Sequence, residues 1–84
     1  MFDVLYSKQA RKFILDADKI LARRLLSKIE ELQGGPILHD TKGIQGFKEK
    51  LYRVRVGDYR ILYEVDFGAR VIGIVKIDKR SRAY

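Results

Sequence analysis

The segment Leu51–Tyr63, LYRVRVGDYRILY, restricts the fold of this chain more than any other part of the sequence. Two runs of alternating side chains flank Gly57-Asp58, and a glycine at the first position of a two-residue turn is typical of a type II′ β-hairpin. Such a turn sets the register of both strands: Val56 lies opposite Tyr59, and each step outward pairs the next two residues. We therefore predict an antiparallel hairpin in which the partner of every residue is known.

This pairing separates the side chains of the hairpin into two faces, because directly opposed residues lie on the same side of a sheet. One face is almost wholly apolar and is expected to lie under helices; it carries Tyr52, Val54, Val56, Tyr59, Ile61 and Tyr63. Three arginines converge on the other face, which carries Leu51, Arg53, Arg55, Arg60, Leu62 and Glu64.

The segment before the hairpin predicts one strand and two helices. Phe2–Tyr6 alternates loosely, as a short strand does. Ser7 supplies an N-cap for a helix that begins near Lys8, and Asp18 supplies one for a second helix, Lys19–Gln33. Gly34-Gly35-Pro36 ends the second helix, and a polar connection, Ile37–Lys50, leads to the hairpin.

A further strand follows the hairpin. Asp66–Ala69 contains Gly68 and predicts a turn, after which Arg70–Asp78 reads as a strand with apolar residues at both parities, so its register is left open. The order strand, helix, helix, three strands predicts an α+β fold (β-α-α-β-β-β). In it a helical hairpin packs on one face of a small, mostly antiparallel four-stranded sheet, with residues 1–84 forming one domain.

The charge balance indicates an anionic partner. Eighteen Lys and Arg against eleven Asp and Glu give a net charge of +7, which favours nucleic acid, a membrane surface or an acidic protein. No apolar run approaches the ~20 residues that cross a bilayer, and the N-terminus lacks the order of an export signal. We expect a cytoplasmic protein that does not bind a membrane.

Several chemistries are disfavoured by what the sequence lacks. There is no cysteine and a single histidine, His39, so disulfides are excluded and no metal-ligand cluster is predicted. A two-histidine ribonuclease site cannot be built, and the serines have no evident triad partners. We therefore expect neither a metal nor a cofactor.

The remaining signal is cationic and aromatic. Arg55 directly opposite Arg60 costs up to about 1 kcal/mol by repulsion; a bound polyanion would relieve it, as would side chains that splay into solvent. The tail Lys79-Arg80-Ser81-Arg82, followed by Tyr84, adds further cations and a ring. Arginines on phosphates and aromatics on bases are the ingredients of single-stranded RNA binding, although Tyr84 could instead anchor the tail.

These residues resemble the RelE/ParE toxin superfamily. LYRVRVGDYRILYEV is similar to the "YR-x-R-x-G-x-YR" hairpin of that family, and KRSRAY resembles its "R-x-R-x-Y" ending, most like archaeal RelE. The predicted order of elements is also that of the family. The resemblance implies a toxin that enters the ribosomal A site and cuts messenger RNA without metal, by attack of the 2′-hydroxyl on the adjacent phosphate.

The resemblance also implies which residues act. By motif position the catalytic residues are Arg53, Arg55, Arg60, Arg80 and Tyr84, and Lys79 and Arg82 are expected to bind RNA. Arg60 and Arg80 would stabilise charge on the pentavalent phosphate, and Arg53 and Arg55 would orient the RNA backbone. Tyr84 would stack on a base or accept the 2′-hydroxyl proton. Some relatives have lysine where Arg53 and Arg55 stand, and arginine is not an acid–base group.

The expected partners are a cognate antitoxin protein, the ribosome and messenger RNA. Two other functions stay open within the superfamily. One is a ParE-like toxin that inhibits DNA gyrase, although such members commonly lack the full arginine and tyrosine set. The other is an inactive member that only binds its antitoxin or nucleic acid.

Overall fold

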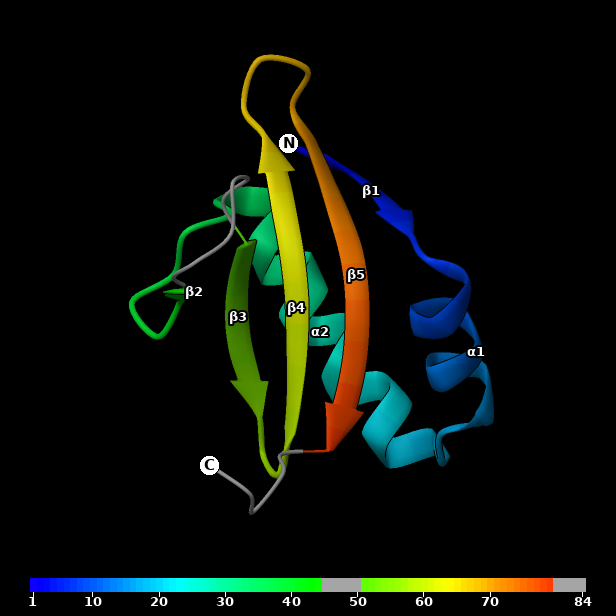
Figure 1. Cartoon of the computed structure of the whole chain (residues 1–84). Helices are drawn as coiled ribbons and strands as arrows, with labels where there is room; N and C mark the ends of the chain where they lie inside the picture. The colour runs from blue at the N-terminus through cyan, green and yellow to red at the C-terminus, as the bar shows by residue number, and fades with distance from the viewer. Residues whose placement is uncertain (45–50, 80–84) are drawn as a thin grey trace.

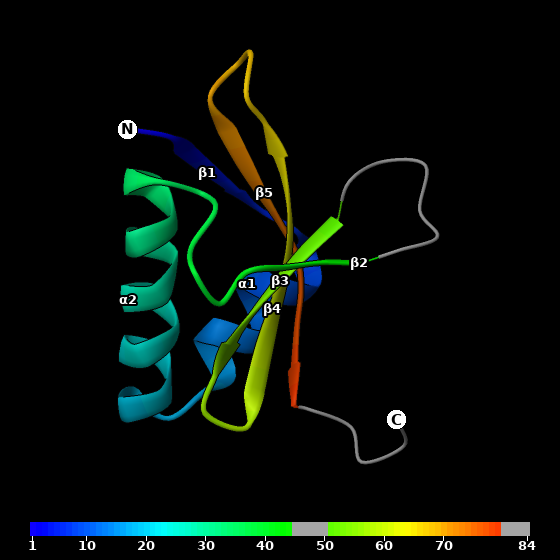
Figure 2. The same ribbon diagram turned by 90° about the vertical axis from the view of Figure 1, so that its left-hand side faces the viewer.

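The computed structural model describes residues 1–44 and 51–79 and places both helices on one side of a five-stranded sheet (Figures 1 and 2). The strand order is β1-β5-β4-β3-β2; β1 is parallel to β5, and the other neighbours are antiparallel. The elements are β1 (Asp3–Tyr6), α1 (Lys8–Asp16), α2 (Lys19–Gly34), β2 (Lys42–Ile44), β3 (Leu51–Val56), β4 (Tyr59–Asp66) and β5 (Val71–Lys79). The predicted α+β class is confirmed, and the sheet has one strand more than the four expected.

The additional strand, β2, lies in the segment expected to be a polar connection. Its three residues pair with the start of β3, with Lys42 opposite Arg53 and Ile44 opposite Leu51. Three residues are too few to show an alternating pattern, so the strand is recognisable only from its pairing with a neighbour.

Both predicted helix starts are confirmed. The Ser7 side chain accepts a hydrogen bond from the Ala10 amide at 3.1 Å. The Asp18 carboxylate accepts one from the Leu21 amide at 2.8 Å. Each cap satisfies an amide that has no partner within the first turn of its helix.

The hairpin has the predicted register, from Val56 opposite Tyr59 to Tyr52 opposite Tyr63. Gly57 has φ 59°, and among the described non-glycine residues only Arg70 has a positive φ, which is the pattern of a type II′ turn. A Cβ at position 57 would lie 3.0 Å from a guanidinium nitrogen of Arg24 on α2. The turn therefore needs glycine for its conformation and leaves little room for a side chain.

A bulge in β5 decides the faces of the last strand. Leu62 of β4 pairs with Lys76, whereas the next residue, Tyr63, pairs with Ile74, so Val75 is the extra residue. Ile72 and Ile74 precede the bulge and are buried, and Ile77 after it is buried as well. The shift explains why apolar residues occur at both parities in this strand.

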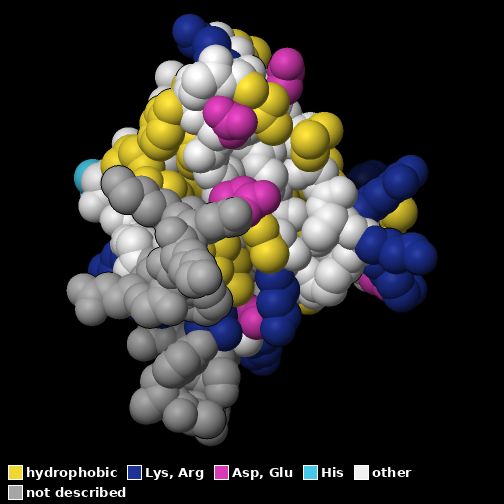
Figure 3. Space-filling view, turned by 45° about the horizontal axis from the view of Figure 1, so that its top comes forward, with side chains coloured by type: hydrophobic (Ala, Val, Ile, Leu, Met, Phe, Trp, Pro, Cys, Tyr) yellow, Lys and Arg dark blue, Asp and Glu magenta, His cyan; other side chains and the backbone are white. Residues whose placement is uncertain are grey.

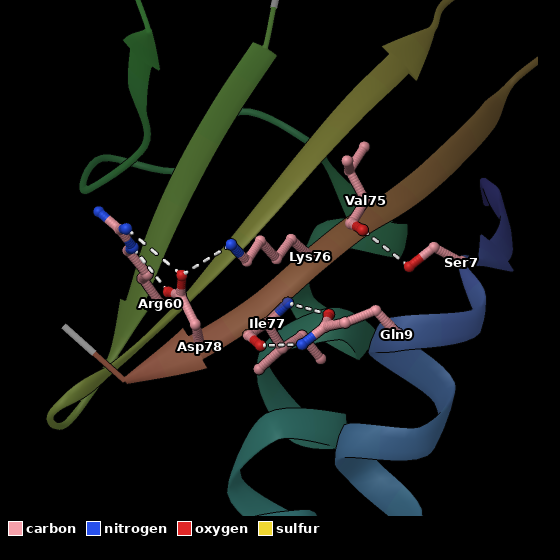
Figure 4. Close-up of polar contacts among 7 residues, drawn as sticks. All are labelled: Ser7, Gln9, Arg60, Val75, Lys76, Ile77 and Asp78. Carbon is pink, nitrogen blue, oxygen red and sulfur yellow. Dashed lines mark hydrogen bonds and ion pairs between the residues drawn. The ribbon is translucent and has the colours of Figure 1, made fainter. Parts of the chain in front are cut away.

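Side chains of Ser7 and Gln9, at the start of α1, hold β5 beside the bulge, where pairing with β1 has ended (Figure 4). The Ser7 hydroxyl donates to the Val75 carbonyl at 2.7 Å. The Gln9 amide group donates to the Ile77 carbonyl at 2.7 Å and accepts from the Ile77 amide at 2.9 Å. These side chains thus satisfy backbone groups that a neighbouring strand would otherwise pair.

The core lies between the helices and the side of the sheet that faces them. α2 contributes Leu25, Ile29 and Leu32, and the strands contribute Val54, Val56, Ile61, Tyr63, Ile72, Ile74 and Ile77. Fully burying one such aliphatic side chain contributes roughly 1.5–3 kcal/mol. Both described helices lie on the core side of the sheet (Figure 2), and the opposite side of the sheet is hereafter called the open face.

A chain of hydrogen bonds positions the connection that delivers β2. The fully buried Tyr63 donates its hydroxyl proton to the Pro36 carbonyl at 2.6 Å. Because this uses the only hydroxyl proton of Tyr63, the Thr41 hydroxyl, 3.0 Å away, is the donor to the Tyr63 oxygen. The Thr41 oxygen also accepts a hydrogen bond from the Leu38 amide at 2.9 Å. Burial raises the pKa of the Tyr63 phenol, so it stays a donor at neutral pH.

We predict that Tyr63→Phe lowers the free energy of unfolding by about 1–2 kcal/mol, because the Pro36 carbonyl loses its donor inside the core. Urea denaturation measures this, with Tyr6→Phe, which removes a hydroxyl from a residue that is 39% exposed, as the control. An unchanged midpoint for Tyr63→Phe would show that the hydroxyl does not hold this connection.

An ion pair attaches the same connection to α2. The Lys28 ammonium lies 2.8 Å from an Asp40 carboxylate oxygen, and the two side chains are 16% and 33% exposed. Its hydrogen bond to Lys28 holds the pKa of Asp40 below its usual range. The stabilisation is therefore present above the unfolded pKa of Asp, about 3.9, and is lost as the pH falls through the lower folded pKa.

We predict that Asp40→Asn destabilises the protein at pH 7 by at most about 1 kcal/mol, since the pair is partly solvated. The difference from the unmodified protein should begin to shrink below about pH 4, where Asp40 of the unfolded chain takes up a proton, and should be gone once the pH is below the lower folded pKa. Denaturation curves from about pH 7 to about pH 2.5 measure it. Asp16→Asn is the control, because its pair with Lys12 is largely exposed; an equal, pH-independent loss in both variants would contradict the prediction.

Candidate nucleic-acid interface

Two adjacent rows of the open face bring five cations of the described residues together. The first row runs Arg55, Arg60, Asp78 across β3, β4 and β5. The second runs Lys42, Arg53, Leu62, Lys76 across β2, β3, β4 and β5. We call this part of the sheet the cationic end, defined by Lys42, Arg53, Arg55, Arg60 and Lys76.

The predicted arginines share this surface but differ in exposure. Arg55 is exposed, whereas Arg53 and Arg60 are half-buried between neighbouring side chains. The sequence does not predict the positions of Lys42 and Lys76 on this surface. Lys42 lies in a segment expected to be a connection, and Lys76 lies in a strand whose register the sequence leaves open. Their place on the open face follows from the pairing of β2 with β3 and of β4 with β5.

The other half of the open face has a different chemistry. Glu64 lies opposite Gly73 and Asp66 opposite Val71, and Leu5 and Phe67 are 65% and 55% exposed. These residues border an open hollow of about 1030 Å³. Figure 3 shows acidic and hydrophobic side chains over the upper part of the visible face, with Lys and Arg side chains below them, at the right-hand margin and at the top edge. A polyanion is therefore expected to follow the cationic end only.

Arg60 has an acidic partner that the sequence does not predict (Figure 4). Its Nε atom lies 2.7 Å from Oδ1 of Asp78, and its Nη2 atom lies 3.3 Å from Oδ2. The Lys76 ammonium lies 3.7 Å from Oδ2. Asp78 thus supplies, within the chain, a negative charge beside the opposed pair Arg55 and Arg60. The bulge at Val75 produces this contact by turning Asp78 toward the open face.

The tyrosines of the hairpin lie on the helix side, as expected. The Tyr52 and Tyr63 rings are 5.7 Å apart, and Tyr59 meets Phe13 of α1 edge to face at 5.8 Å. These three rings fill the core side of the sheet and do not provide a stacking surface on the open face.

The basic tail is only partly described. Lys79 is exposed and lies opposite Tyr59, so its backbone position faces the helix side rather than the open face. Arg80, Arg82 and Tyr84 lie outside the described residues. β5 does end beside the row that contains Arg60 and Asp78.

The described residues provide no metal site and no membrane-spanning helix. Within residues 1–44 and 51–79, no three His, Cys, Asp or Glu side chains are grouped so that they could hold a metal ion. His39 is exposed in the connection between α2 and β2. Neither helix of the described ranges is long and apolar enough to cross a bilayer.

Comparison with known proteins gives consistent matches. The family model for the "ParE toxin of type II toxin-antitoxin system, parDE" matches residues 4–84. "Putative toxin RelE1" of Methanocaldococcus jannaschii is 33% identical over 99% of this chain and 94% of its own length. "Toxin RelE" of Mycobacterium tuberculosis is 31% identical over 76% of this chain and 70% of its own.

Solved structures agree with this assignment. A chain of the archaeal RelE–RelB complex from Pyrococcus horikoshii superposes with a TM-score of 0.85 at 34% identity, covering 98% of both chains. The isolated RelE toxin of E. coli superposes with a TM-score of 0.83 at 19% identity, covering 99% of this chain and 88% of the other; at that identity the likeness shows the fold alone.

We predict that Arg53→Ala and Arg55→Ala each weaken binding of single-stranded RNA and flatten its salt dependence, with the log–log slope changing by about 0.7 for each phosphate that is no longer neutralised. Fluorescence anisotropy between about 50 and 300 mM salt measures this. Arg11→Ala, which removes an exposed cation from α1, should change the slope much less. Equal effects at all three positions would mean that RNA is attracted by net charge alone.

Proposed function

The chain belongs to the RelE/ParE family of toxins of type II toxin–antitoxin systems, and from this membership we propose that it is a ribosome-dependent endoribonuclease. Its substrate would be messenger RNA in the ribosomal A site, and cleavage would stop translation. This activity requires a cytoplasmic protein. The observation that supports it most directly is the row of Arg55, Arg60 and Asp78 beside Lys42, Arg53 and Lys76 on the face of the sheet opposite the helices.

The proposed reaction is an in-line transesterification. The 2′-oxygen of one nucleotide forms a bond to the adjacent phosphorus while the bond to the 5′-oxygen breaks, leaving a 2′,3′-cyclic phosphate and a 5′-hydroxyl. One proton leaves the 2′-hydroxyl and one is added to the 5′-oxygen. No metal is needed, because cationic side chains can carry the charge that accumulates on the phosphate.

The residues of the cationic end fit the charge requirements of this reaction. Arg53 and Arg55 would hold the RNA backbone in line. Arg60 would stabilise the pentavalent phosphate, together with Arg80, which follows the end of β5 by one residue. Tyr84 is the proposed proton acceptor or base-stacking residue, since arginine stays protonated and cannot accept a proton. Lys79 and Arg82 would bind flanking RNA.

A cognate antitoxin is the proposed protein partner. Relatives of this chain have been crystallised as RelE–RelB complexes, including the one from Pyrococcus horikoshii. An antitoxin with an acidic segment would neutralise the cationic end and compete with RNA for it.

The second candidate function is inhibition of DNA gyrase, because the family model that matches bears the ParE name. The two curated relatives are instead named RelE. The presence of Arg60, Arg80 and Tyr84 together favours the nuclease, since gyrase-inhibiting members commonly lack the full arginine and tyrosine set. An inactive member that only binds its antitoxin is the third candidate.

We predict that the purified protein cleaves message on programmed ribosomes and that Arg80→Ala slows cleavage by at least about a hundredfold, as loss of one transition-state donor does in other enzymes. Primer extension locates the cuts, and circular dichroism confirms that the variant is folded. Arg11→Ala serves as the charge-matched control and should retain activity.

Gyrase supercoiling assays on the same preparations separate the candidate functions. Intact message combined with blocked supercoiling would establish the gyrase function instead. Intact message with normal supercoiling would leave antitoxin binding as the function, and full activity of folded Arg80→Ala would overturn the assignment of Arg80.

A further inference from the structure

Asp78 places one carboxylate among the five side chains of the cationic end. It lies directly opposite Arg60, which in turn lies opposite Arg55. The acidic residues of β4, Glu64 and Asp66, lie opposite Gly73 and Val71, toward the far end of the sheet. A surface that only attracted RNA would be weakened by a carboxylate at this position.

The contact occupies a particular edge of the guanidinium. Oδ1 and Oδ2 of Asp78 lie 2.7 Å from Nε and 3.3 Å from Nη2 of Arg60. These two nitrogens form one of the edges with which arginine grips a carboxylate or a phosphate in two-pronged fashion. The pair is sheltered, with the Arg60 side chain 16% exposed and that of Asp78 24% exposed, so its geometry is better defined than that of an exposed ion pair.

The contact between Asp78 and Arg60 affects the intact RNA phosphate and the pentavalent phosphate of the reaction differently. The phosphate of an intact RNA backbone carries one negative charge, whereas the pentavalent phosphate carries more. A singly charged phosphate competes poorly with the Asp78 carboxylate for Arg60. A group whose charge increases during the reaction competes better, and only interactions that strengthen in the transition state accelerate the chemical step.

We propose that Asp78 is a positioning residue for Arg60: it holds the guanidinium in one orientation and limits its binding to RNA before reaction. The inference rests on the proposed nuclease function. Lys76, whose ammonium lies 3.7 Å from Oδ2 and whose side chain is 54% exposed, orients the carboxylate from the other side.

The test combines Asp78→Asn with a charge-matched control, Glu64→Gln, on the same face. Asp78→Asn should bind single-stranded RNA about three- to tenfold more tightly, because the Nε–Nη2 edge of Arg60 is released to bind a phosphate. The salt dependence should steepen by about 0.7 in log–log slope, as one more phosphate is neutralised. Glu64→Gln should change affinity less than about twofold, since exposed and distant charges are screened.

The cleavage measurement separates positioning from simple competition. On programmed ribosomes, Asp78→Asn should lower the single-turnover rate constant by about tenfold or more while the half-saturating concentration falls, because Arg60 is no longer held in place. Asp78→Glu keeps the charge but displaces the carboxylate, so it should retain weak RNA binding and still cleave slowly. Faster cleavage by Asp78→Asn would overturn the positioning role and leave competition alone.

Arg60 must be required for the effect on binding. In an Arg60→Ala background, Asp78→Asn should tighten RNA binding no more than Glu64→Gln does; an undiminished effect would overturn the inference. Reduced stability of Asp78→Asn without a change in RNA affinity would show a purely structural ion pair. If the unmodified protein does not cleave message, the proposed nuclease function fails. The RNA affinities of Asp78→Asn with and without Arg60 still decide whether Asp78 controls the Arg60 side chain.

Discussion

The central strand β4 pairs with β3 through a two-residue turn and with β5 through a bulge, and these two pairings determine which side chains share a face. The turn at Gly57-Asp58 places the apolar residues of the hairpin under α2 and its arginines on the open face. The bulge at Val75 keeps Ile74 and Ile77 in the core on either side of it. Both effects follow from the two-residue period of a strand, in which a shift of one residue exchanges the faces.

The same bulge connects the core to the candidate site. Without it, strict alternation from Ile72 and Ile74 would direct Lys76 and Asp78 into the core and Ile77 outward. With it, both charged residues join Arg60 on the open face, where Asp78 forms the two-pronged contact. The start of α1 supports this geometry through the hydrogen bonds that Ser7 and Gln9 make to the backbone of β5. Core packing and the electrostatics of the site therefore depend on one register.

Charge is divided along the open face rather than spread over it. The cationic end and the acidic, apolar half occupy opposite parts of the same strands, so the net charge of +7 understates the local field. Such a division guides a polyanion along one path and discourages it from the other. This division of charge is consistent with membership of a toxin family, other members of which have been crystallised with antitoxin proteins.

The sequence by itself determined the α+β class, both helix caps, the hairpin register and the shared face of Arg53, Arg55 and Arg60, because each is encoded by residues close together in the chain. Motifs in the hairpin and tail also identified the family. Only the tertiary structure decided the strand β2, the position of the bulge, and the placement of Lys42, Lys76 and Asp78 beside the arginines. Pairing between strands that are distant in the sequence is set by packing of the whole core. Because β5 has apolar residues at both odd and even positions, its sequence pattern fits either face and could not assign the register.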